Sequence, residues 1–568
     1  MHKFKNMSSA WLSLLIAGVC GCLLALPFTI YDGSAFVWFS LAPVFWLVAR
    51  TARPGQAVAV AAIFALSWTS ASFSFIWPVT VIGMIAMCLY TTLFYVAALM
   101  SVRMIARWSI LAAVVGSAAL WVSLEIIRSI LPVFGFPWLL LGHALLGHEY
   151  LRQGADLMGV YGLSFLIVAV NAAIAFALPA GLIEQWRVAG TTRTYFSKKV
   201  TVQAILPQRT QRDTDDFIFC PHVVKSLWLC GERLPQKSAL VAGALVAALL
   251  LGDLLYGQMR VAQISPRLYA GPQIALIQGN VAQKLDRSNN ELKAQLDRHL
   301  ELHRQIVSDI KSVDLMPVLI CWAETMAPGA LNEDEWGEAF KKQVKTCGVP
   351  TLTGSEYQAS DEIIARAYNA AYILDADGHE IGRYAKRRLV PFGEYIPFTT
   401  AFPFLKVLRS VTRDQYEPGK DVSPVVTVGG YRMAINICIE DIHPDLAREA
   451  AKAGADTLVN LTNDGWFYGS FGPRAHLQAA AWRAIETRRP LLRVTNTGHT
   501  VAVDPLGNVR LLIPPETEGV AMTSLVRIDA GATEVRTLSM EVGEMGILLF
   551  MIGLLAACWL KRLMSAGV

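Results

Sequence analysis

The stretch Tyr431-Arg432-Met433-Ala434-Ile435-Asn436-Ile437-Cys438-Ile439 is an apolar run with a cysteine near its end. It follows the turn Gly429-Gly430 and a shorter apolar run at 424–428, and together they predict a β-hairpin. Further along the chain, residues 445–453 predict a short helix and residues 457–461 a buried strand. Strands that alternate with helices in this way are typical of a layered α/β domain.

The same alternation extends on both sides of this stretch, within residues 257–544. Hydrophobic periodicity predicts strands at 273–281, 316–322, 368–374, 491–495 and 500–503, and helices at 289–312 and 473–488. The fold class expected for this part is a sandwich of sheets with helices on its outer faces, an αββα arrangement.

The remainder of the chain has the composition of a membrane protein. Of its 568 residues, 54% are hydrophobic and 17% charged, whereas soluble proteins have about 25% charged residues. Long apolar runs fill residues 9–256, and charged residues crowd residues 283–545. One part is therefore solvated by lipid and the other by water. The net charge of +5 follows membrane topology and does not indicate a nucleic-acid partner.

Eight segments are long and apolar enough, or nearly so, to span a bilayer. They are residues 9–29, 35–49, 56–76, 79–102, 109–127, 160–184, 238–256 and 545–560. Lys3 and Lys5 precede the first segment as in a signal peptide, but further spans follow at once, so a retained helix is expected. An eight-helix transmembrane bundle is the fold expected for this part.

Positive charge in the connections orients these spans. Lys and Arg residues lie at Arg50, Arg53, Arg103 and Arg107, in the loop 185–236, and after the last span at Lys561 and Arg562, whereas the short alternate connections 30–34 and 77–78 carry none. Because positive connections stay in the cytoplasm, both chain ends are expected inside. The predicted organisation is a transmembrane domain at 1–256 with seven spans and a cytoplasmic loop at 185–236. An extracytoplasmic domain at 257–544 and a C-terminal transmembrane helix at 545–568 follow.

Two connections and a histidine pair have more than one interpretation. Residues 129–159 fit either an amphipathic segment in the membrane interface or a re-entrant loop. The loop 185–236 holds Cys220, His222 and Cys230, at a spacing that matches no standard zinc pattern. His299 and His303 lie four residues apart on a predicted helix without a carboxylate motif, so a solvated face is expected for them rather than a metal. No metal site and no cofactor are predicted.

Three polar side chains stand where predicted strands end, namely Glu324, Lys386 and Cys438. Each alone has an ordinary explanation, since a cysteine in an apolar strand is usually a small buried hydrophobe. Together they have another, because a carboxylate can take the proton of a thiol and an ammonium can stabilise both a thiolate and an oxyanion. The combination favours nucleophilic catalysis at Cys438.

Five motifs now carry a resemblance. They are Gln278-Gly279-Asn280, Trp322-Ala323-Glu324-Thr325, Lys386 with Leu389-Val390-Pro391-Phe392-Gly393-Glu394-Tyr395, Cys438-Ile439-Glu440, and Thr462-Asn463-Asp464-Gly465-Trp466-Phe467, with Arg489–Gly498 fitting as well. They resemble the Glu-Lys-Cys signature of the nitrilase superfamily. On a frame of eight spans, the chain resembles the bacterial apolipoprotein N-acyltransferases over nearly its whole length.

The resemblance implies a two-step acyl transfer. Cys438 would be the nucleophile, Glu324 the general base and Lys386 the oxyanion stabiliser. Glu394 would hold Lys386, with Glu440 in support, and the backbone N–H of Ile439 would share the oxyanion. The donor would be a phospholipid and the acceptor the α-amine of a diacylglyceryl-cysteine on an apolipoprotein. The place implied is the bacterial inner membrane, with the catalytic domain on the periplasmic side and a monomer expected.

Aromatic side chains near these motifs are candidates for binding the acyl chains. Phe392, Tyr395 and Trp466 are the predicted substrate-binding residues, within a rim that also includes Phe467, Tyr468 and Phe471. Aromatic residues favour membrane interfaces, although each of these also fits ordinary packing.

The sequence departs from the family at two positions. Ile439 stands where an aromatic residue often follows the nucleophile, and Arg287 stands near an expected Trp. Two other functions stay open. One is a membrane-tethered amidase that hydrolyses a small amide. The other is a transporter or lipid-binding scaffold, against which Glu125 is the only acidic residue expected within the first six spans.

Overall fold

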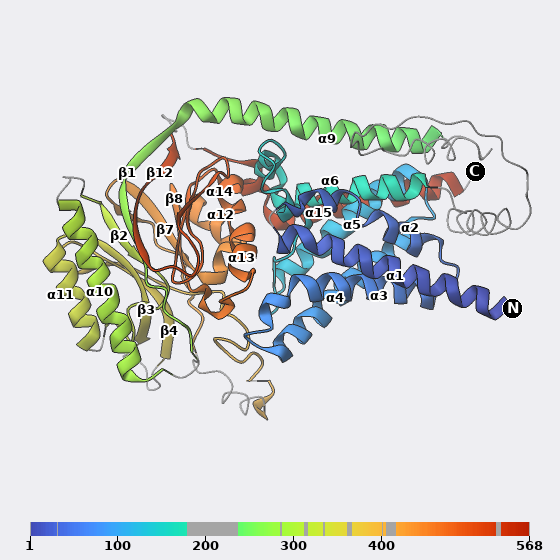
Figure 1. Ribbon diagram of the computed structural model, residues 1–568. Helices are drawn as coiled ribbons and strands as arrows, with labels where there is room; N and C mark the ends of the chain where they lie inside the picture. Colours follow the sequence, from blue (N-terminus) through green and yellow to red (C-terminus); the bar gives the residue numbers. More distant parts are fainter. Residues whose placement is uncertain are drawn as a thin grey trace, which may run out of the picture.

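A computed structural model describes most of the chain. The described residues are 2–30, 32–178, 237–284, 287–311, 316–332, 335–359, 366–399, 401–404, 416–529 and 535–566. The loop 185–236, with Cys220, His222 and Cys230, lies outside them. A helical bundle and a β-sandwich lie end to end (Figure 1).

Eight helical segments among the described residues are long and apolar enough to cross a membrane, as the sequence predicts. They comprise α1 (His2–Thr29), η1 (Gly33–Trp38) with α2 (Ala42–Arg50), α3 (Pro54–Ser72), α4 (Val81–Ile105), α5 (Ile110–Ile130), η4 (Leu151–Gly154) with α6 (Ala155–Ala177), α9 (Lys237–Ile264) and α15 (Leu538–Ala566). The chain is a multi-pass membrane protein.

The sixth span begins earlier than expected, at Leu151 instead of residue 160. Arg152, Gln153 and Asp156 lower the hydropathy of this first part, which is why the sequence placed it outside the span. A break at Met158 and Gly159 separates it from the rest of the helix. Asp156 is therefore a second acidic residue within the first six spans, and the expectation that Glu125 stands alone is wrong.

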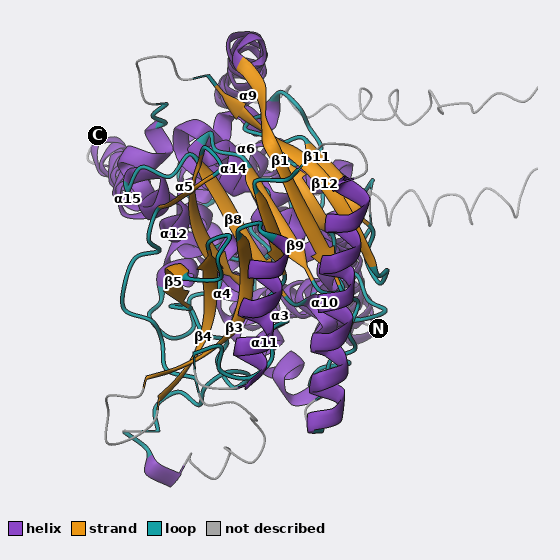
Figure 2. Ribbon diagram, turned by 90° about the vertical axis from the view of Figure 1, so that its left-hand side faces the viewer, coloured by secondary structure: helices purple, strands orange, loops and turns teal. Residues whose placement is uncertain are grey.

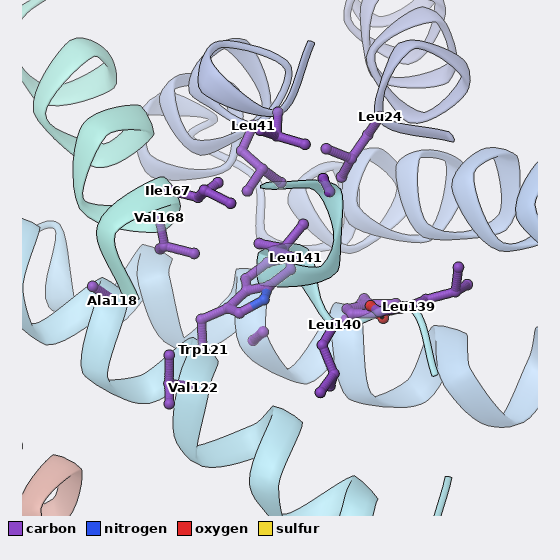
Figure 3. Close-up of a cluster of buried hydrophobic side chains, with 14 of the residues drawn as sticks. Leu24, Leu41, Ala118, Trp121, Val122, Leu139, Leu140, Leu141, Ile167 and Val168 are labelled. Atoms are coloured by element: carbon purple, nitrogen blue, oxygen red, sulfur yellow. The ribbon is translucent and has the colours of Figure 1, made fainter. Parts of the chain in front are cut away.

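The connection between α5 and α6 folds back into the helical bundle, which favours the second of the two interpretations left open, a re-entrant loop. Figure 3 shows Leu139, Leu140 and Leu141 among side chains of the surrounding helices, including Trp121. All three leucines are fully buried. The Glu125 carboxylate fixes the segment, because its Oε1 accepts hydrogen bonds from the backbone N–H of Leu141 (3.0 Å) and from Trp121 Nε1 (3.1 Å). A buried carboxylate with two donors here serves the fold of the bundle.

The α/β part contains two six-stranded sheets. The first has the order β12-β1-β2-β3-β4-β5 and the second β11-β10-β9-β8-β7-β6. Their bounds are β1 (Leu268–Gln278), β2 (Leu319–Trp322), β3 (Thr351–Ala359), β4 (Arg366–Leu374), β5 (Glu380–Ala385), β6 (Val426–Val428), β7 (Tyr431–Ile437), β8 (Thr457–Thr462), β9 (Leu491–Thr495), β10 (Thr500–Val503), β11 (Val509–Ile513) and β12 (Gly519–Ile528). The central strands β1–β3 and β7–β9 pair in parallel, and the outer pairs are antiparallel.

Helices cover the outer face of each sheet. Those on the first sheet are α10 (Asn289–Lys311) and α11 (Glu335–Cys347), which lie in front of the strands in Figure 2. Those on the second sheet are α12 (Pro444–Lys452), α13 (Gly472–Ala480) and α14 (Trp482–Thr487), which lie between this sheet and the bundle (Figure 1). The predicted αββα sandwich is confirmed. The single helix expected at 473–488 is wrong in detail, since it divides into α13 and α14.

His299 and His303 do not lie on a solvated face, which corrects the expectation for them. Both side chains are fully buried on the side of α10 that faces the first sheet. Their rings lie 5.2 and 5.9 Å from the ring of Trp322. The polar residues of α10 on the other side of the helix misled the sequence analysis.

The second sheet and the bundle share one apolar core. Ile442, Trp482 and Ile485 belong to the same buried cluster as the bundle residues Trp138 and Leu141, and Ile439 packs against that cluster. The helix α9 adds a covalent link, because it continues through η5 (Ser265–Arg267) into β1. The sandwich is thus seated directly on one end of the bundle.

Candidate active site

Cys438 lies in a strained turn where β7 ends. Its φ is +53°, a left-handed conformation that non-glycine residues seldom adopt, and its side chain is half-buried. Two hydrogen bonds hold this turn: Asn460 Nδ2 donates to the carbonyl oxygen of Cys438 (2.9 Å), and the backbone N–H of Ile437 donates to Glu440 Oε2 (2.8 Å). Backbone strain kept in place in this way is common at functional sites.

Glu324 and Lys386 meet in a buried ion pair. Glu324 follows β2 by two residues and Lys386 follows β5, and Lys386 Nζ lies 3.1 Å from Glu324 Oε1. The same Nζ lies 2.9 Å from Glu394 Oε1, so the ammonium stands between two carboxylates. Asn369 of β4 joins them, because its Nδ2 donates to Glu324 Oε1 (2.8 Å) and to Glu394 Oε1 (2.9 Å).

The electrostatics tie Cys438 to this ion pair. Burial alone would lower the pKa of the Lys386 ammonium, but the charges of Glu324, Glu394 and Cys438 hold that pKa well above its usual range. Burial raises the pKa of the Cys438 thiol, the Glu324 carboxylate raises it further, and the Lys386 ammonium opposes both. The structure thus brings the three predicted residues together, with the sulfur as a neutral thiol at rest.

Glu440 connects the loop after Lys386 to the turn of Cys438 through hydrogen bonds. Its Oε1 accepts hydrogen bonds from Tyr384 Oη (2.9 Å) and from the backbone N–H groups of Arg387 (2.7 Å) and Arg388 (3.0 Å). Its Oε2 accepts from the N–H of Ile437, and the side chain is fully buried. Glu440 therefore fixes the loop after Lys386 against the turn of Cys438, and it does not face the reacting atoms.

Sequence analysis missed a buried cluster beside the nucleophile turn, here called the ionic cluster: Asp441, Asp464, His476 and Arg493. All four side chains are at most 1% exposed. His476 Nε2 lies 2.9 Å from Asp441 Oδ1, and Nδ1 lies 2.8 Å from Asp464 Oδ1. Arg493 pairs with both carboxylates, at 3.1 and 3.2 Å, and its Nη2 lies 2.7 Å from His476 Nδ1.

These contacts determine the charges of the ionic cluster. The two carboxylates that face the ring favour the imidazolium, since they raise the pKa of His476 despite burial and the nearby Arg493. Burial opposes ionisation of Asp464, but Arg493 and His476 lower its pKa to about 2. With His476 protonated, two negative and two positive groups balance. Because Asp441 lies only three residues after Cys438, the ionic cluster holds the turn that contains Cys438 in place.

The predicted aromatic rim divides into two groups. Phe392, Trp466 and Tyr468 are 50%, 40% and 56% exposed, respectively, whereas Tyr395 is half-buried. Phe467 and Phe471 instead pack against Phe75 of the bundle, with ring centroids 5.2 and 5.5 Å apart. Phe392, Trp466 and Tyr468 thus keep exposed ring surface, whereas packing explains Phe467 and Phe471.

The two departures from the family pattern occupy defined places. Ile439 is partly buried against the apolar cluster of the bundle. Arg287 contacts Gln295, whose Nε2 donates to the carbonyl oxygens of Thr325 (3.0 Å) and Met326 (3.1 Å). Arg287 therefore supports the segment after Glu324.

One group among the described residues has three side chains close enough to share a metal ion: Asp375, Asp377 and His379. It lies in the hairpin turn between β4 and β5, where Asp375 Oδ1 accepts hydrogen bonds from the N–H groups of Asp377 and His379 (2.9 Å each). This geometry is that of an ordinary Asx turn.

Comparison with known proteins agrees with both parts of the structure. The model of the apolipoprotein N-acyltransferase N-terminal domain matches residues 20–173, and that of the carbon-nitrogen hydrolases matches residues 273–536. An apolipoprotein N-acyltransferase of Geobacter metallireducens is 29% identical over 532 residues, which cover 91% of this chain and 90% of that protein.

The chain belongs to the apolipoprotein N-acyltransferase family.

Other similarities cover one part only. An apolipoprotein N-acyltransferase of Pseudomonas aeruginosa is 33% identical over 255 residues, 44% of this chain and 47% of that protein. Among solved structures, a mutant amidase of the nitrilase superfamily from Nesterenkonia is 18% identical, with a TM-score of 0.34 over 45% of this chain and 91% of that one. As a member of the apolipoprotein N-acyltransferase family, the chain is an acyltransferase with a nitrilase-like domain.

Proposed function

We propose that this protein moves an acyl chain from a phospholipid to the α-amine of an N-terminal diacylglyceryl-cysteine on a lipoprotein, through a thioester on Cys438. The observation that carries the proposal is that the turn containing Cys438 packs against the helical bundle. Ile439 and Ile442, on either side of Glu440, pack into the apolar core of the bundle. A thiol held there opens at the level of the membrane, where a phospholipid ester lies.

In the first step, the Cys438 sulfur attacks the ester carbonyl carbon while Glu324 accepts the thiol proton. The carbonyl oxygen becomes an oxyanion beside the Lys386 ammonium, and the backbone N–H of Ile439 supplies a second donor. The tetrahedral intermediate then expels the alkoxide of the lysophospholipid, which takes the proton back from Glu324. The product is a thioester, and Glu324 is again ionised.

In the second step, the α-amine attacks the thioester. Glu324 accepts a proton from the attacking nitrogen and passes it to the departing sulfur, so that an amide and a neutral thiol result. The same residues act in both steps because each step moves one proton and forms one oxyanion.

The charge of the site stays constant through each step. At rest, Glu324, Glu394 and Lys386 carry a net charge of −1, and the raised pKa of Cys438 keeps the thiol neutral. When the proton reaches Glu324, one negative charge disappears from the carboxylate and appears on the oxyanion. Lys386 can therefore switch partners without a new charge being buried.

The orientation is part of the proposal. We assign residues 1–256 and 545–568 to the inner membrane of a bacterium and residues 257–544 to the periplasm. The start of α1 and the end of α15 lie at the end of the bundle opposite the sandwich (Figure 1). Lys561 and Arg562 belong to the last part of α15. The same end carries Arg103, whose guanidinium donates to the carbonyl oxygens of Val48 and Thr51. Positive charge at this end supports its cytoplasmic assignment.

The proposal is tested with the full-length protein in lipid nanodiscs that contain phosphatidylethanolamine with an isotope-labelled sn-1 chain. We expect peptide mass spectrometry to find the label on Cys438, as an adduct that hydroxylamine removes. Addition of a diacylglyceryl peptide should move the label into an amide.

Cys438→Ala, which leaves the buried Cys321 intact, is the control and should acquire no label while inserting normally into the membrane. Full transfer by this variant would remove the assigned nucleophile. An unlabelled Cys438 in a protein that hydrolyses small amides would favour the amidase alternative.

A further inference from the structure

Asp156 is a buried carboxylate at the sandwich end of a membrane helix, where three parts of the chain meet. It is 2% exposed and accepts hydrogen bonds from Tyr256 Oη (2.6 Å) and Arg260 Nε (2.8 Å), both on α9. From the sandwich, Arg488 donates to Asp156 Oδ2 through Nε (3.1 Å) and Nη2 (2.7 Å). One carboxylate thus joins the bundle, the connecting helix and the catalytic domain.

Every nitrogen of the Arg488 guanidinium donates a hydrogen bond. Its side chain is fully buried, and its Nη1 donates to Gln153 Oε1 (2.7 Å) and to the carbonyl oxygen of Pro505 (2.9 Å). The backbone of Arg488 has a φ of +54°, in the left-handed region that is costly for a residue with a Cβ. Such a conformation persists only where surrounding contacts determine it, and here the contacts with α6 do so.

A second row of contacts runs beside this one. Arg152 Nε donates to the carbonyl oxygen of Leu506 (2.8 Å), and Arg152 Nη2 donates to Asn508 Oδ1 (2.5 Å). On the other side, the backbone N–H of Val160 donates to Glu486 Oε1 (3.0 Å). The start of the sixth span therefore contacts the sandwich at two further places, namely at Glu486, shortly before Arg488, and at the turn after β10.

Three paired β-strands connect these contacts to the nucleophile. Arg488 precedes the first residue of β9 by three positions. β9 pairs in parallel with β8, and β8 pairs in parallel with β7, which ends beside Cys438. Central parallel strands do not slide past one another without losing their hydrogen bonds. A displacement of Arg488 relative to the bundle would therefore displace Cys438 relative to the membrane.

We infer that Asp156 and Arg488 are positioning residues, which set the height and tilt of Cys438 relative to the outer leaflet so that a phospholipid ester reaches the sulfur. The inference rests on the proposed function and deepens it. The planar fork of arginine suits this role, because it binds Asp156 and Gln153 in a fixed orientation that an ammonium cannot impose. Small errors in such positioning are costly in rate.

The test compares a lipid substrate with a water-soluble probe in the full-length protein in nanodiscs. The variants are Arg488→Lys, which keeps the positive charge but loses the planar fork, and Asp156→Asn, which keeps the shape of the side chain but loses its negative charge. The matched control is Arg432→Lys, since Arg432 and Asp456 form an exposed ion pair (3.4 Å) on the same sandwich. For each variant, thioester formation from labelled phosphatidylethanolamine is compared with alkylation of Cys438 by iodoacetamide, resolved by peptide mass spectrometry.

We expect Arg488→Lys and Asp156→Asn to slow thioester formation at saturating lipid by roughly tenfold to a hundredfold. Alkylation of Cys438, which depends on its local environment, should stay within about twofold of the wild type. Arg432→Lys should change neither rate.

Each other result has a defined meaning. Equal losses in both rates would overturn the inference, because they would show that the contacts only stabilise the site. Unchanged lipid acylation in both variants would overturn it as well. If the wild type forms no lipid thioester while Cys438 is alkylated normally, the proposed function itself fails.

Discussion

Two buried ionic groups lie close together in this protein and differ in how their charges are balanced. Around the nucleophile, two carboxylates share a single ammonium, Lys386, and the neighbouring Cys438 is half-buried. In the ionic cluster, two carboxylates face an imidazolium and a guanidinium, and all four side chains are closed off from solvent.

The difference separates chemistry from support. A balanced and sealed group has no reason to exchange protons, and it fixes the elements that contribute to it. A group with one uncompensated negative charge and an accessible thiol can transfer that charge to a developing oxyanion by moving a proton. If this distinction holds, variants of the first group should lose rate, and variants of the second should lose stability.

The largest effect is expected for Glu324→Gln. Without the carboxylate, the thiol proton has no acceptor, and acyl transfer should fall about a thousandfold. The same carboxylate raises the pKa of Cys438, so its removal should increase the thiolate fraction. Alkylation of Cys438 at pH 8 should therefore become faster while transfer is lost. A parallel decrease in both rates would contradict the assignment of Glu324 as the base.

Lys386→Met should reduce transfer by roughly several hundredfold, since it removes the charge that faces the oxyanion. The matched control is Lys341→Met on α11, where the lysine makes an exposed i,i+3 pair with Glu338 (2.9 Å). Steady-state rates with phospholipid and acceptor peptide provide the measurement. Equal losses in the two variants would show that Lys386 has no special role.

Arg493→Met should act mainly on stability. It leaves two buried carboxylates with one imidazolium, and breaking a buried ion pair in this way costs about 3–5 kcal/mol. Thermal unfolding in detergent should show a lower midpoint, while the transfer rate per folded molecule should fall less than in the two variants above. A large loss of rate at unchanged stability would place the ionic cluster within the catalytic machinery.

The smallest effect concerns His299 and His303, which burial keeps neutral by lowering the pKa of each to about 4. In the unfolded chain both bind protons near pH 6.5. Their contribution to stability is therefore complete above pH 6.5 and declines as the pH falls toward 4, by up to about 3 kcal/mol each.

Melting curves at pH 7.5 and pH 5 check this prediction. His303→Leu should lose less stability on acidification than the wild type. The control is His379→Leu, at a histidine whose side chain is 77% exposed. Identical acid sensitivity in all three proteins would show that the buried rings do not titrate in this range.

Much of this architecture could be predicted from local patterns. Long apolar runs determine spans, because lipid offers the backbone no other partner than itself. Alternating strands and helices predicted the sandwich for the same reason, since each element must bury one face. The motifs around Glu324, Lys386 and Cys438 predicted three residues that the structure brings together, because each stands at the end of a strand.

What could not be predicted depends on pairs that are distant in the sequence. Asp156 and Arg488 are 332 residues apart, and polar residues near Asp156 made that part of the span resemble a loop. His476 and Arg493 belong to a helix and a strand that look ordinary by themselves. Asn369 offered one weak signal, an amide within the apolar run of β4, and its position between Glu324 and Glu394 appears only once the strands are placed side by side.

The apolar core shared by the nucleophile turn and the bundle makes the catalytic half inseparable from the membrane half. A fragment cut at residues 257 and 544 would present Ile442, Trp482 and Ile485 to water, all of them fully buried in the intact chain. Such a surface favours aggregation over a soluble enzyme. For crystallisation or inhibitor screening, a detergent-free version of this domain would need those side chains redesigned first.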